Sequence, residues 1–264
     1  MMITHLPHTQ TEKTIVVLGD SIAHGYGLPK GYAWPQLLHE QLQASYPRYD
    51  WRIHNESVPG DTVADAYVRF DVVRAHHPHL LLIALGVNDC RRAHSPIVDR
   101  RIEIFHRNER TWWGRHALLR RLGYLLNPLP AAEAQKDVDS QVPMEDFLSI
   151  LGWMVRQAQI MDALPAFVTM APLSPELADD PHFAPCARYN TAIRDLARDV
   201  QAALIEVSYP LASGAWQVDG VHLSVRGQAE IAQRVFKNFN RPPIATHLGI
   251  QTRESNAYMA PSLD

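Results

Sequence analysis

Short runs of β-branched and aliphatic residues alternate along the chain with stretches of helical periodicity. The runs predict five strands, at 14–18, 51–57, 80–85, 166–170 and 203–207. The run at 80–85 is purely aliphatic and is followed by a glycine, which is typical of a strand that a parallel sheet buries on both faces. Because strands and helices alternate, the pattern predicts an α/β fold with a mostly parallel five-stranded sheet.

Five stretches have apolar residues at helical spacing, and one follows each predicted strand. They predict helices at 34–46, 62–75, 145–163, 187–202 and 224–239. We expect Ser224 to be the N-cap of the last helix, because a serine hydroxyl accepts hydrogen bonds from backbone N–H groups of a first helical turn.

The regular alternation is interrupted from residue 91 to about 145. This segment is rich in arginine, contains two adjacent tryptophans, and ends in a proline-rich acidic stretch. We interpret it as a helical lid or insert, because long connections in compact domains are usually functional or disordered. The tail, at about 241–264, has weak periodicity and is expected to be extended. The length of 264 residues fits a single domain, 1–264, that carries both additions.

Composition and charge exclude several classes of protein. The formal net charge of −3 argues against a nucleic-acid-binding protein, because such proteins usually carry a clear basic excess. The longest apolar run is too short to span a bilayer, and the N-terminal residues contain no apolar segment typical of a secretory signal. We therefore expect a soluble, cytoplasmic protein with no integral membrane association.

The chain has two cysteines, Cys90 and Cys186, and no CxxC pair. With so few cysteines a disulfide framework is not expected, and a reducing compartment is the simpler interpretation. We interpret Cys90 as a small buried or half-buried thiol.

Four short polar segments follow predicted strands or lie in the last loop of the chain. They are Gly19–Ser21, Asn55–Thr62, Gly86–Asp89 and Asp219–His222. Ligands of open parallel sheets bind outside the carboxyl ends of the strands, so we expect the four segments to converge on one crevice.

Ser21 is the candidate nucleophile, but a serine hydroxyl is a weak nucleophile until a base accepts its proton. His222 is the candidate base. Asp219 precedes it by three residues, so its carboxylate can reach the imidazole Nδ1 and stabilise the imidazolium. A developing oxyanion also needs hydrogen-bond donors. The candidates are the backbone N–H groups of Ser21 and Gly60 and the side-chain amide of Asn88.

In their order along the chain, the four segments resemble the characteristic blocks of the SGNH (GDSL-like) hydrolase superfamily. The GDS block is Gly19–Ser21, the block-two glycine is Gly60, the GxND block is Gly86–Asp89, and the DxxH block is Asp219–His222. The resemblance covers most of the chain outside the insert, although Ile22 stands where the name-giving motif has leucine. It implies a flavodoxin-like three-layer α/β/α sandwich. The residues after Gly60 are similar to those of the lysophospholipase/arylesterase branch.

The residues and the resemblance together predict a serine esterase that acts through an acyl-enzyme on a small-molecule, lipid or carbohydrate ester. A short acyl group such as acetyl is preferred, because no long apolar groove can be inferred from the sequence. One alternative is an acyltransferase, in which an alcohol replaces water at the same site. Another is a non-catalytic module that binds a carbohydrate or a partner protein.

Neither a metal nor an organic cofactor is expected. The segment His76–His79 has no acidic or cysteine residue nearby in the sequence, and a solvated loop is the preferred interpretation.

Three residues of the insert, Arg91, Trp112 and Trp113, are candidate substrate-binding residues. The arginines of this segment can form a positive rim that recruits an anionic substrate. The preferred interpretation is a solvated amphipathic lid, because acidic residues at 99, 103 and 109 can pair with several of the arginines.

Overall fold

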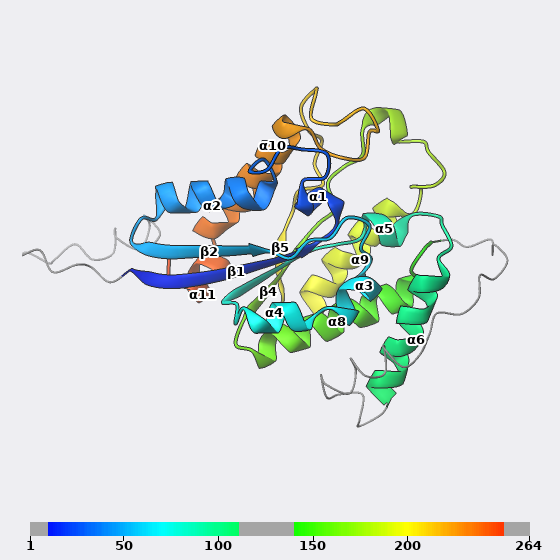
Figure 1. The fold of residues 1–264 in the computed structure, drawn as a ribbon, viewed down its shortest axis with the longest axis horizontal. Coiled ribbons are helices and arrows are strands. Elements are labelled where there is room, and N and C mark those ends of the chain that lie inside the picture. Colours follow the sequence, from blue (N-terminus) through cyan, green and yellow to red (C-terminus); the bar gives the residue numbers. More distant parts are fainter. Residues whose placement is uncertain (1–9, 111–139, 251–264) are drawn as a thin grey trace, which may run out of the picture.

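The protein is described by a computed structural model that covers residues 10–110 and 140–250. Its centre is a five-stranded sheet in the order β2-β1-β3-β4-β5 (Figure 1). The strands are β1 (Thr11–Gly19), β2 (Tyr49–Asn55), β3 (Leu80–Ala84), β4 (Leu164–Val168) and β5 (Ala203–Ile205). All neighbouring strands pair in parallel. This strand order is the flavodoxin-like one, so the predicted fold class is confirmed.

Helices cover both faces of the sheet and make three layers (Figure 1). One face carries α2 (Trp34–Ser45), α10 (Val225–Phe236) and α11 (Ile244–Leu248). The other face carries α3 (Val63–Val68), α4 (Asp71–Ala75), α6 (Pro96–Arg110), α8 (Met144–Ile160) and α9 (Cys186–Asp199). Two short helices, α1 (Ser21–His24) and α5 (Val87–Cys90), follow β1 and β3, and 3-10 turns lie at Pro175–Leu177 and Lys237–Asn240.

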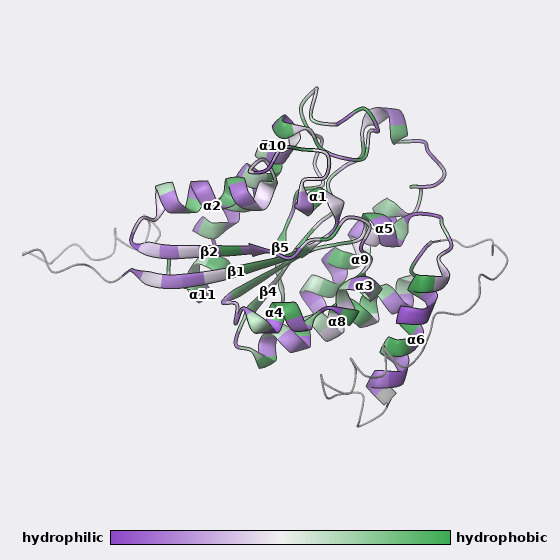
Figure 2. Ribbon diagram, in the orientation of Figure 1, coloured by the Kyte–Doolittle hydropathy of each residue, from purple (hydrophilic) through white to green (hydrophobic). Residues whose placement is uncertain are grey.

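Alternate residues of the central strands supply two separate hydrophobic cores. Val16 and Leu81 pack on the side of α8, whereas Ile15 and Leu80 pack on the side of α2, and all four are fully buried. Successive side chains of a strand point to opposite faces, so a sheet covered on both faces needs continuous apolar runs. Figure 2 shows this hydrophobic centre, with hydrophilic residues along the outer helices.

The predicted helix at 62–75 is divided into α3 and α4. The hydrogen bonds from Phe70 N to the Tyr67 carbonyl and from Val72 N to the Arg69 carbonyl span three residues instead of four. The chain therefore tightens at Phe70, whose ring is buried in the core. Ser224 is the N-cap of α10, as predicted, and its hydroxyl accepts a hydrogen bond from Gly227 N.

The tail from about residue 241 is not extended over its first part, which corrects the prediction. Residues Ile244–Leu248 form α11, and Ile244, Leu248 and Ile250 are buried. The Tyr49 hydroxyl donates to the Gly249 carbonyl, and a ring nitrogen of His247 bonds to the His79 carbonyl. A helix of this length gives almost no periodicity, so its burial depends on contacts with distant residues. Residues 251–264 lie outside the described residues.

The first part of the insert is helical, as predicted. In α6 the side chains of Val98, Ile102 and Phe105 are buried in the core beside α3. Figure 1 shows α6 next to α3 and α8, on the face of the sheet opposite to α2. The remainder of the insert, residues 111–139, lies outside the described residues.

Cys90 and Cys186 form a disulfide, which corrects the prediction of reduced thiols. Their Cα atoms are 5.2 Å apart although 96 residues separate them in the sequence. The pairing was not predicted because it requires α5 and the first residue of α9 to meet, which only the fold brings about. Among the helices of the described chain, none combines the length and apolar composition needed to cross a membrane.

Candidate active site

Ser21 is the first residue of α1, and only Asp20 separates it from the end of β1. Asp20 caps this helix, since its backbone is extended and its carboxylate accepts a hydrogen bond of 2.9 Å from Ile22 N. The cap fixes the turn between strand and helix. Only 7% of Ser21 is exposed, so neighbouring residues cover most of it.

The structure brings together the predicted nucleophile, Ser21, the predicted base, His222, and the carboxylate of Asp219. His222 Nε2 lies 2.9 Å from Ser21 Oγ, and His222 Nδ1 lies 2.6 Å from Asp219 Oδ2. A carboxylate only accepts hydrogen bonds, so the Nδ1 atom carries the proton and Nε2 is free to accept one from the serine. This is the arrangement that nucleophilic catalysis by a serine requires.

Backbone groups of its own loop hold Asp219 in place. Its Oδ1 atom accepts hydrogen bonds from Val221 N and His222 N, at 3.0 and 2.9 Å. Partial desolvation raises the pKa of Asp219, but the hydrogen bonds from His222 and Val221 outweigh it and keep the pKa below its ordinary value. The carboxylate is therefore ionised over the range in which a histidine base works, and it can stabilise an imidazolium.

The segments that carry the candidate oxyanion donors are bonded to one another. Val58 N donates to the Gly19 carbonyl at 3.1 Å, and Asn88 Nδ2 donates to the Asp61 carbonyl at 2.9 Å. Gly60 has a φ of +87°, which an L side chain rarely adopts, and no atom lies near the position of a missing Cβ. An amide nitrogen has two hydrogens, so Asn88 can donate one to Asp61 and the other to a substrate oxygen.

Of the three candidate substrate-binding residues, only Arg91 is described. It is exposed directly after α5, and its carbonyl accepts a hydrogen bond from Gln141 N. Trp112 and Trp113 lie outside the described residues. A substrate-binding role for all three stays a prediction.

Two residues that sequence reasoning missed, Tyr26 and Gln217, connect the nucleophile to the base. The Tyr26 ring centroid lies 4.9 Å from that of His222, and Tyr26 N donates to the Ser21 carbonyl. Gln217 Nε2 donates to the carbonyls of Tyr26 and Leu223, and Gln217 N donates to the His222 carbonyl. These bonds hold the His222 loop against the α1 turn. No local sequence pattern signals them, because the Tyr26 ring and the Gln217 side-chain amide contact residues that are distant in the sequence.

The histidine-rich segment before β3 makes ordinary structural contacts. His76 Nε2 lies 2.8 Å from a Glu56 carboxylate oxygen, and His79 Nδ1 accepts a hydrogen bond from Thr14 N. Within the described ranges, no three histidine, cysteine, aspartate or glutamate side chains are grouped so that they could hold a metal ion.

Two buried carboxyl groups lie behind the candidate active site. Burial raises the pKa of Asp89 to about 8, with a further rise from the Asp20 carboxyl, while the hydrogen bond from Val63 N opposes the shift. Burial likewise raises the pKa of Asp20 to about 7, opposed by the hydrogen bond from Ile22 N. Both groups neighbour candidate active-site residues in the chain, so they couple the stability of this region to pH.

Replacing Asp89 with asparagine is expected to remove part of this pH dependence. The folded-state pKa of about 8 lies above the unfolded value of about 4, so the folded state binds the proton more tightly. The contribution of Asp89 to the free energy of unfolding is therefore largest below about pH 4. It falls as pH rises to about 8, by at most about 1.4 kcal/mol per pH unit. The introduced amide does not titrate and keeps an oxygen that accepts from Val63 N, so this part of the slope disappears.

The free energy of unfolding, measured in urea from about pH 5 to about pH 8, tests the prediction. The interval from about pH 7 to about pH 8 is the most informative, because the contribution of Asp20 ends near its pKa of about 7. The matched control is Asp199→Asn, which changes an exposed carboxylate at the end of α9 and keeps the wild-type slope. An unchanged slope in Asp89→Asn would contradict the argument.

Comparison with known proteins gives a family match that spans all four polar segments. The profile of the GDSL-like Lipase/Acylhydrolase family matches residues 17–230. An arylesterase of Vibrio mimicus is 36% identical over 91 residues, which are 34% of this chain and 44% of the relative. Esterase TesA of Pseudomonas aeruginosa is 38% identical over 85 residues, which are 32% of this chain and 41% of the relative. The chain thus matches less than half of the length of each of these relatives.

A solved structure with a similar fold is the lipase/acylhydrolase from Enterococcus faecalis. The TM-score is 0.60 at 16% sequence identity, and the match covers 86% of this chain and 95% of that one. At this identity the likeness concerns the fold, and it agrees with the sheet order described above.

Proposed function

The chain belongs to the GDSL-like Lipase/Acylhydrolase family, and from this premise we propose that it is a serine esterase that forms an acyl-enzyme on Ser21. The observation that carries the proposal is the chain of contacts from Ser21 Oγ to His222 Nε2, at 2.9 Å, and from His222 Nδ1 to Asp219, at 2.6 Å. It joins a nucleophile, a base and an ionised orienting group in the order that acyl transfer needs.

The reaction follows from these positions. His222 takes the proton of the Ser21 hydroxyl as the oxygen attacks the carbonyl carbon of the ester. The carbonyl oxygen becomes an oxyanion, which accepts hydrogen bonds from Ser21 N, Gly60 N and the Asn88 amide. The intermediate collapses when His222 gives its proton to the leaving alcohol, and the acyl group remains on Ser21. Water then attacks the acyl-enzyme, with His222 again as the base, and releases the acid.

A small apolar cavity supports a short acyl group. The cavity has a volume of about 30 Å³ and lies under α1, at the carboxyl ends of β3 and β4. Its lining includes Ile22, which follows the nucleophile, and Val221, which precedes the base, together with Leu85, Met170 and Leu173. The small volume and mostly apolar lining of this cavity favour a short acyl group over a long chain.

We expect kcat/KM for p-nitrophenyl esters to be highest for acetate or butyrate and lower by at least about 10-fold for octanoate and palmitate. The physical reason is that the small cavity leaves little apolar volume for extra methylene groups. Leu173→Ala enlarges the cavity and should shift the preference towards longer chains. The matched control is Leu204→Ala, which removes a half-buried leucine that does not line the cavity. Faster turnover of palmitate than of acetate by the wild type would refute the short-chain assignment.

Labelling with a fluorophosphonate tests the serine-esterase assignment independently of acyl length. We expect one adduct, on Ser21, found by mass spectrometry of the digested protein. An acyltransferase would also be labelled, but its turnover would depend on an added alcohol. A protein that neither hydrolyses any of the esters nor reacts at Ser21 is a binding module, and the proposal would then be wrong.

A further inference from the structure

The helix that carries Asn88 is too short to hold itself in place. It comprises only Val87–Cys90, and no side chain caps its N-terminus. A single helical turn is unstable alone, because the cost of fixing its backbone exceeds what one hydrogen bond returns. The position of the Asn88 amide therefore depends on what α5 is attached to.

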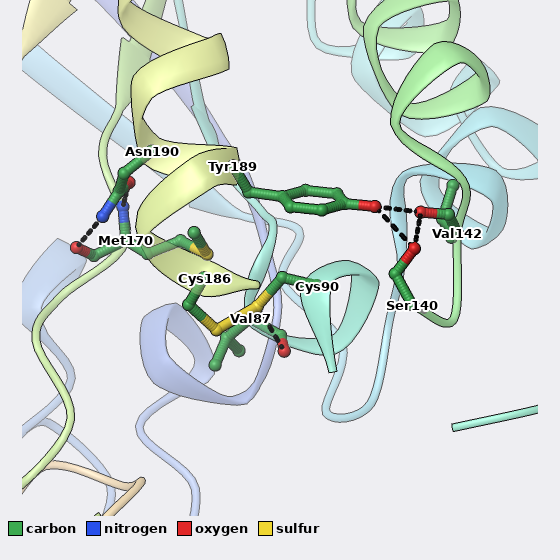
Figure 3. The surroundings of a disulfide bond; sticks show 8 residues. All are labelled: Val87, Cys90, Ser140, Val142, Met170, Cys186, Tyr189 and Asn190. Atoms are coloured by element: carbon green, nitrogen blue, oxygen red, sulfur yellow. Dashed lines mark hydrogen bonds between the residues drawn. A yellow bond between two sulfur atoms is a disulfide. The ribbon is translucent and has the colours of Figure 1, made fainter. Parts of the chain in front are cut away.

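One attachment is the disulfide from Cys90, the last residue of α5, to Cys186, the first residue of α9 (Figure 3). Cys90 is two residues after Asn88 and is completely buried. Its sulfur lies 3.4 Å from the Val87 carbonyl oxygen, within the same turn. The bridge thus joins the end of the Asn88 turn covalently to a helix of fourteen residues.

The first turn of α9 is itself firmly anchored, as Figure 3 shows. The Tyr189 hydroxyl contacts Ser140 Oγ and donates to the Val142 carbonyl, and Val142 N donates to the Asp89 carbonyl. Asn190 bonds to Met170 in both directions, accepting from its N–H at 2.8 Å and donating to its carbonyl. These bonds hold the first part of α9 in place, and the disulfide attaches the helical turn of Asn88 to it.

From this geometry we propose that the Cys90–Cys186 disulfide positions the Asn88 amide for the oxyanion, and that reduction of the bridge slows ester hydrolysis. The inference rests on the proposed function. A dithiol reductant supplies two electrons and two protons: the S–S bond breaks, each sulfur becomes a thiol, and the reductant is oxidised to its own disulfide. Two unbonded thiols cannot approach as closely as two bonded sulfurs, so the end of α5 moves away from α9.

We expect such a reductant to reach the bridge from the side of Cys186. Cys90 is buried, but Cys186 is partly exposed, so a thiolate can attack the sulfur of Cys186. The compartment in which the protein works then decides the state of the bridge, because thiol-rich compartments reduce disulfides and oxidising ones preserve them. The esterase would be fully active in an oxidising environment and slower in a reducing one.

The test compares kcat and KM of oxidised and dithiothreitol-reduced protein, in the wild type and in Asn88→Ala. A misplacement of about 1 Å can cost up to about 100-fold in rate, and we expect reduction to lower the wild-type kcat by about 10-fold with KM unchanged. In Asn88→Ala the donor is absent, so reduction should change kcat by less than about 2-fold. Cys186→Ser, which cannot form the bridge, should reproduce the reduced wild type without any reductant.

Two further measurements separate positioning from a purely structural role. The assays are run well below the melting temperature of the reduced protein, and mass spectrometry after alkylation confirms two free thiols. The rate at which a fluorophosphonate labels Ser21 should fall with kcat, since its phosphoryl oxygen uses the same donors. A bridge that only stabilises the fold would lower the melting temperature and leave both rates unchanged.

Three outcomes are decisive. A reduced wild type with unchanged kcat overturns the inference, and so does an equal loss in Asn88→Ala. If the oxidised wild type hydrolyses esters while either of these is observed, the proposed function stands and only the role of the disulfide is wrong. If the oxidised wild type neither hydrolyses esters nor is labelled at Ser21, the proposed function fails, and this inference fails with it.

Discussion

Replacing Ser21 with alanine is expected to lower kcat for ester hydrolysis by about 10⁶-fold, which is the loss that removal of a triad serine causes in a serine protease. The hydroxyl is the only group of this residue that contacts His222 Nε2, at 2.9 Å, and alanine removes it without changing the backbone. The Ser21 N–H and the other oxyanion donors remain, so the residual rate reports what those donors achieve without a nucleophile. Helix α1 keeps its Asp20 cap, so the variant should fold.

The measurement is initial-rate kinetics with p-nitrophenyl acetate, together with fluorophosphonate labelling. The matched control is Ser45→Ala, which removes an exposed serine hydroxyl at the end of α2 and should leave both readouts unchanged. Retention of wild-type kcat in Ser21→Ala would remove Ser21 from the mechanism. The melting temperature of the variant shows whether a loss of activity comes from chemistry or from unfolding.

Replacing Asn88 with alanine is expected to lower kcat by about 10²–10³-fold and to change KM little, which is the usual cost of losing one oxyanion donor. The donor acts on the charge that develops in the transition state, so the substrate in its ground state loses less. The Asn88 amide also bonds to the Asp61 carbonyl, so alanine removes one of the hydrogen bonds that hold the segment of Gly60. Both effects act on the same developing oxyanion.

Asn88→Asp keeps the shape of the side chain but replaces the amide donor with an acceptor, so it loses the hydrogen bond to the Asp61 carbonyl as well as the oxyanion donor. It should be at least as slow as alanine, since a carboxylate near the oxyanion repels it. Asn240→Ala, remote from α5 in a 3-10 turn, is the control for loss of an asparagine amide. A decrease in kcat/KM that comes entirely from KM would show that Asn88 binds the substrate and does not stabilise the oxyanion.

Much of the candidate site was predictable because its chemistry lies in short local segments. Ser21, Asn88 and the segment of Gly60 each follow a strand, and the carboxyl ends of parallel strands necessarily meet at one edge of a sheet. Asp219 and His222 are close in sequence, so their contact is local too. The hydrogen bond from the Ser21 hydroxyl to His222 joins residues 201 positions apart, and it was predictable only because the four segments occur together in order.

Other features of the structure could not be predicted from any local pattern in the sequence. The supporting contacts of the Tyr26 ring and the Gln217 side-chain amide join segments that are far apart in the sequence. The disulfide joins two cysteines 96 residues apart, and their number alone argued against pairing. These contacts depend on which loops the packed sheet brings side by side.

The sequence by itself determined the strands, most of the helices, the parallel α/β class of the fold and the identity of the candidate nucleophile, base and oxyanion donors. It could do so because hydrophobic periodicity and strand-end motifs are properties of neighbouring residues. Only the tertiary structure decided the break between α3 and α4, the burial of α11, the Cys90–Cys186 bridge and the hydrogen bonds of Gln217. Each of these is set by packing against residues distant in the chain, and packing is a property of the whole folded molecule.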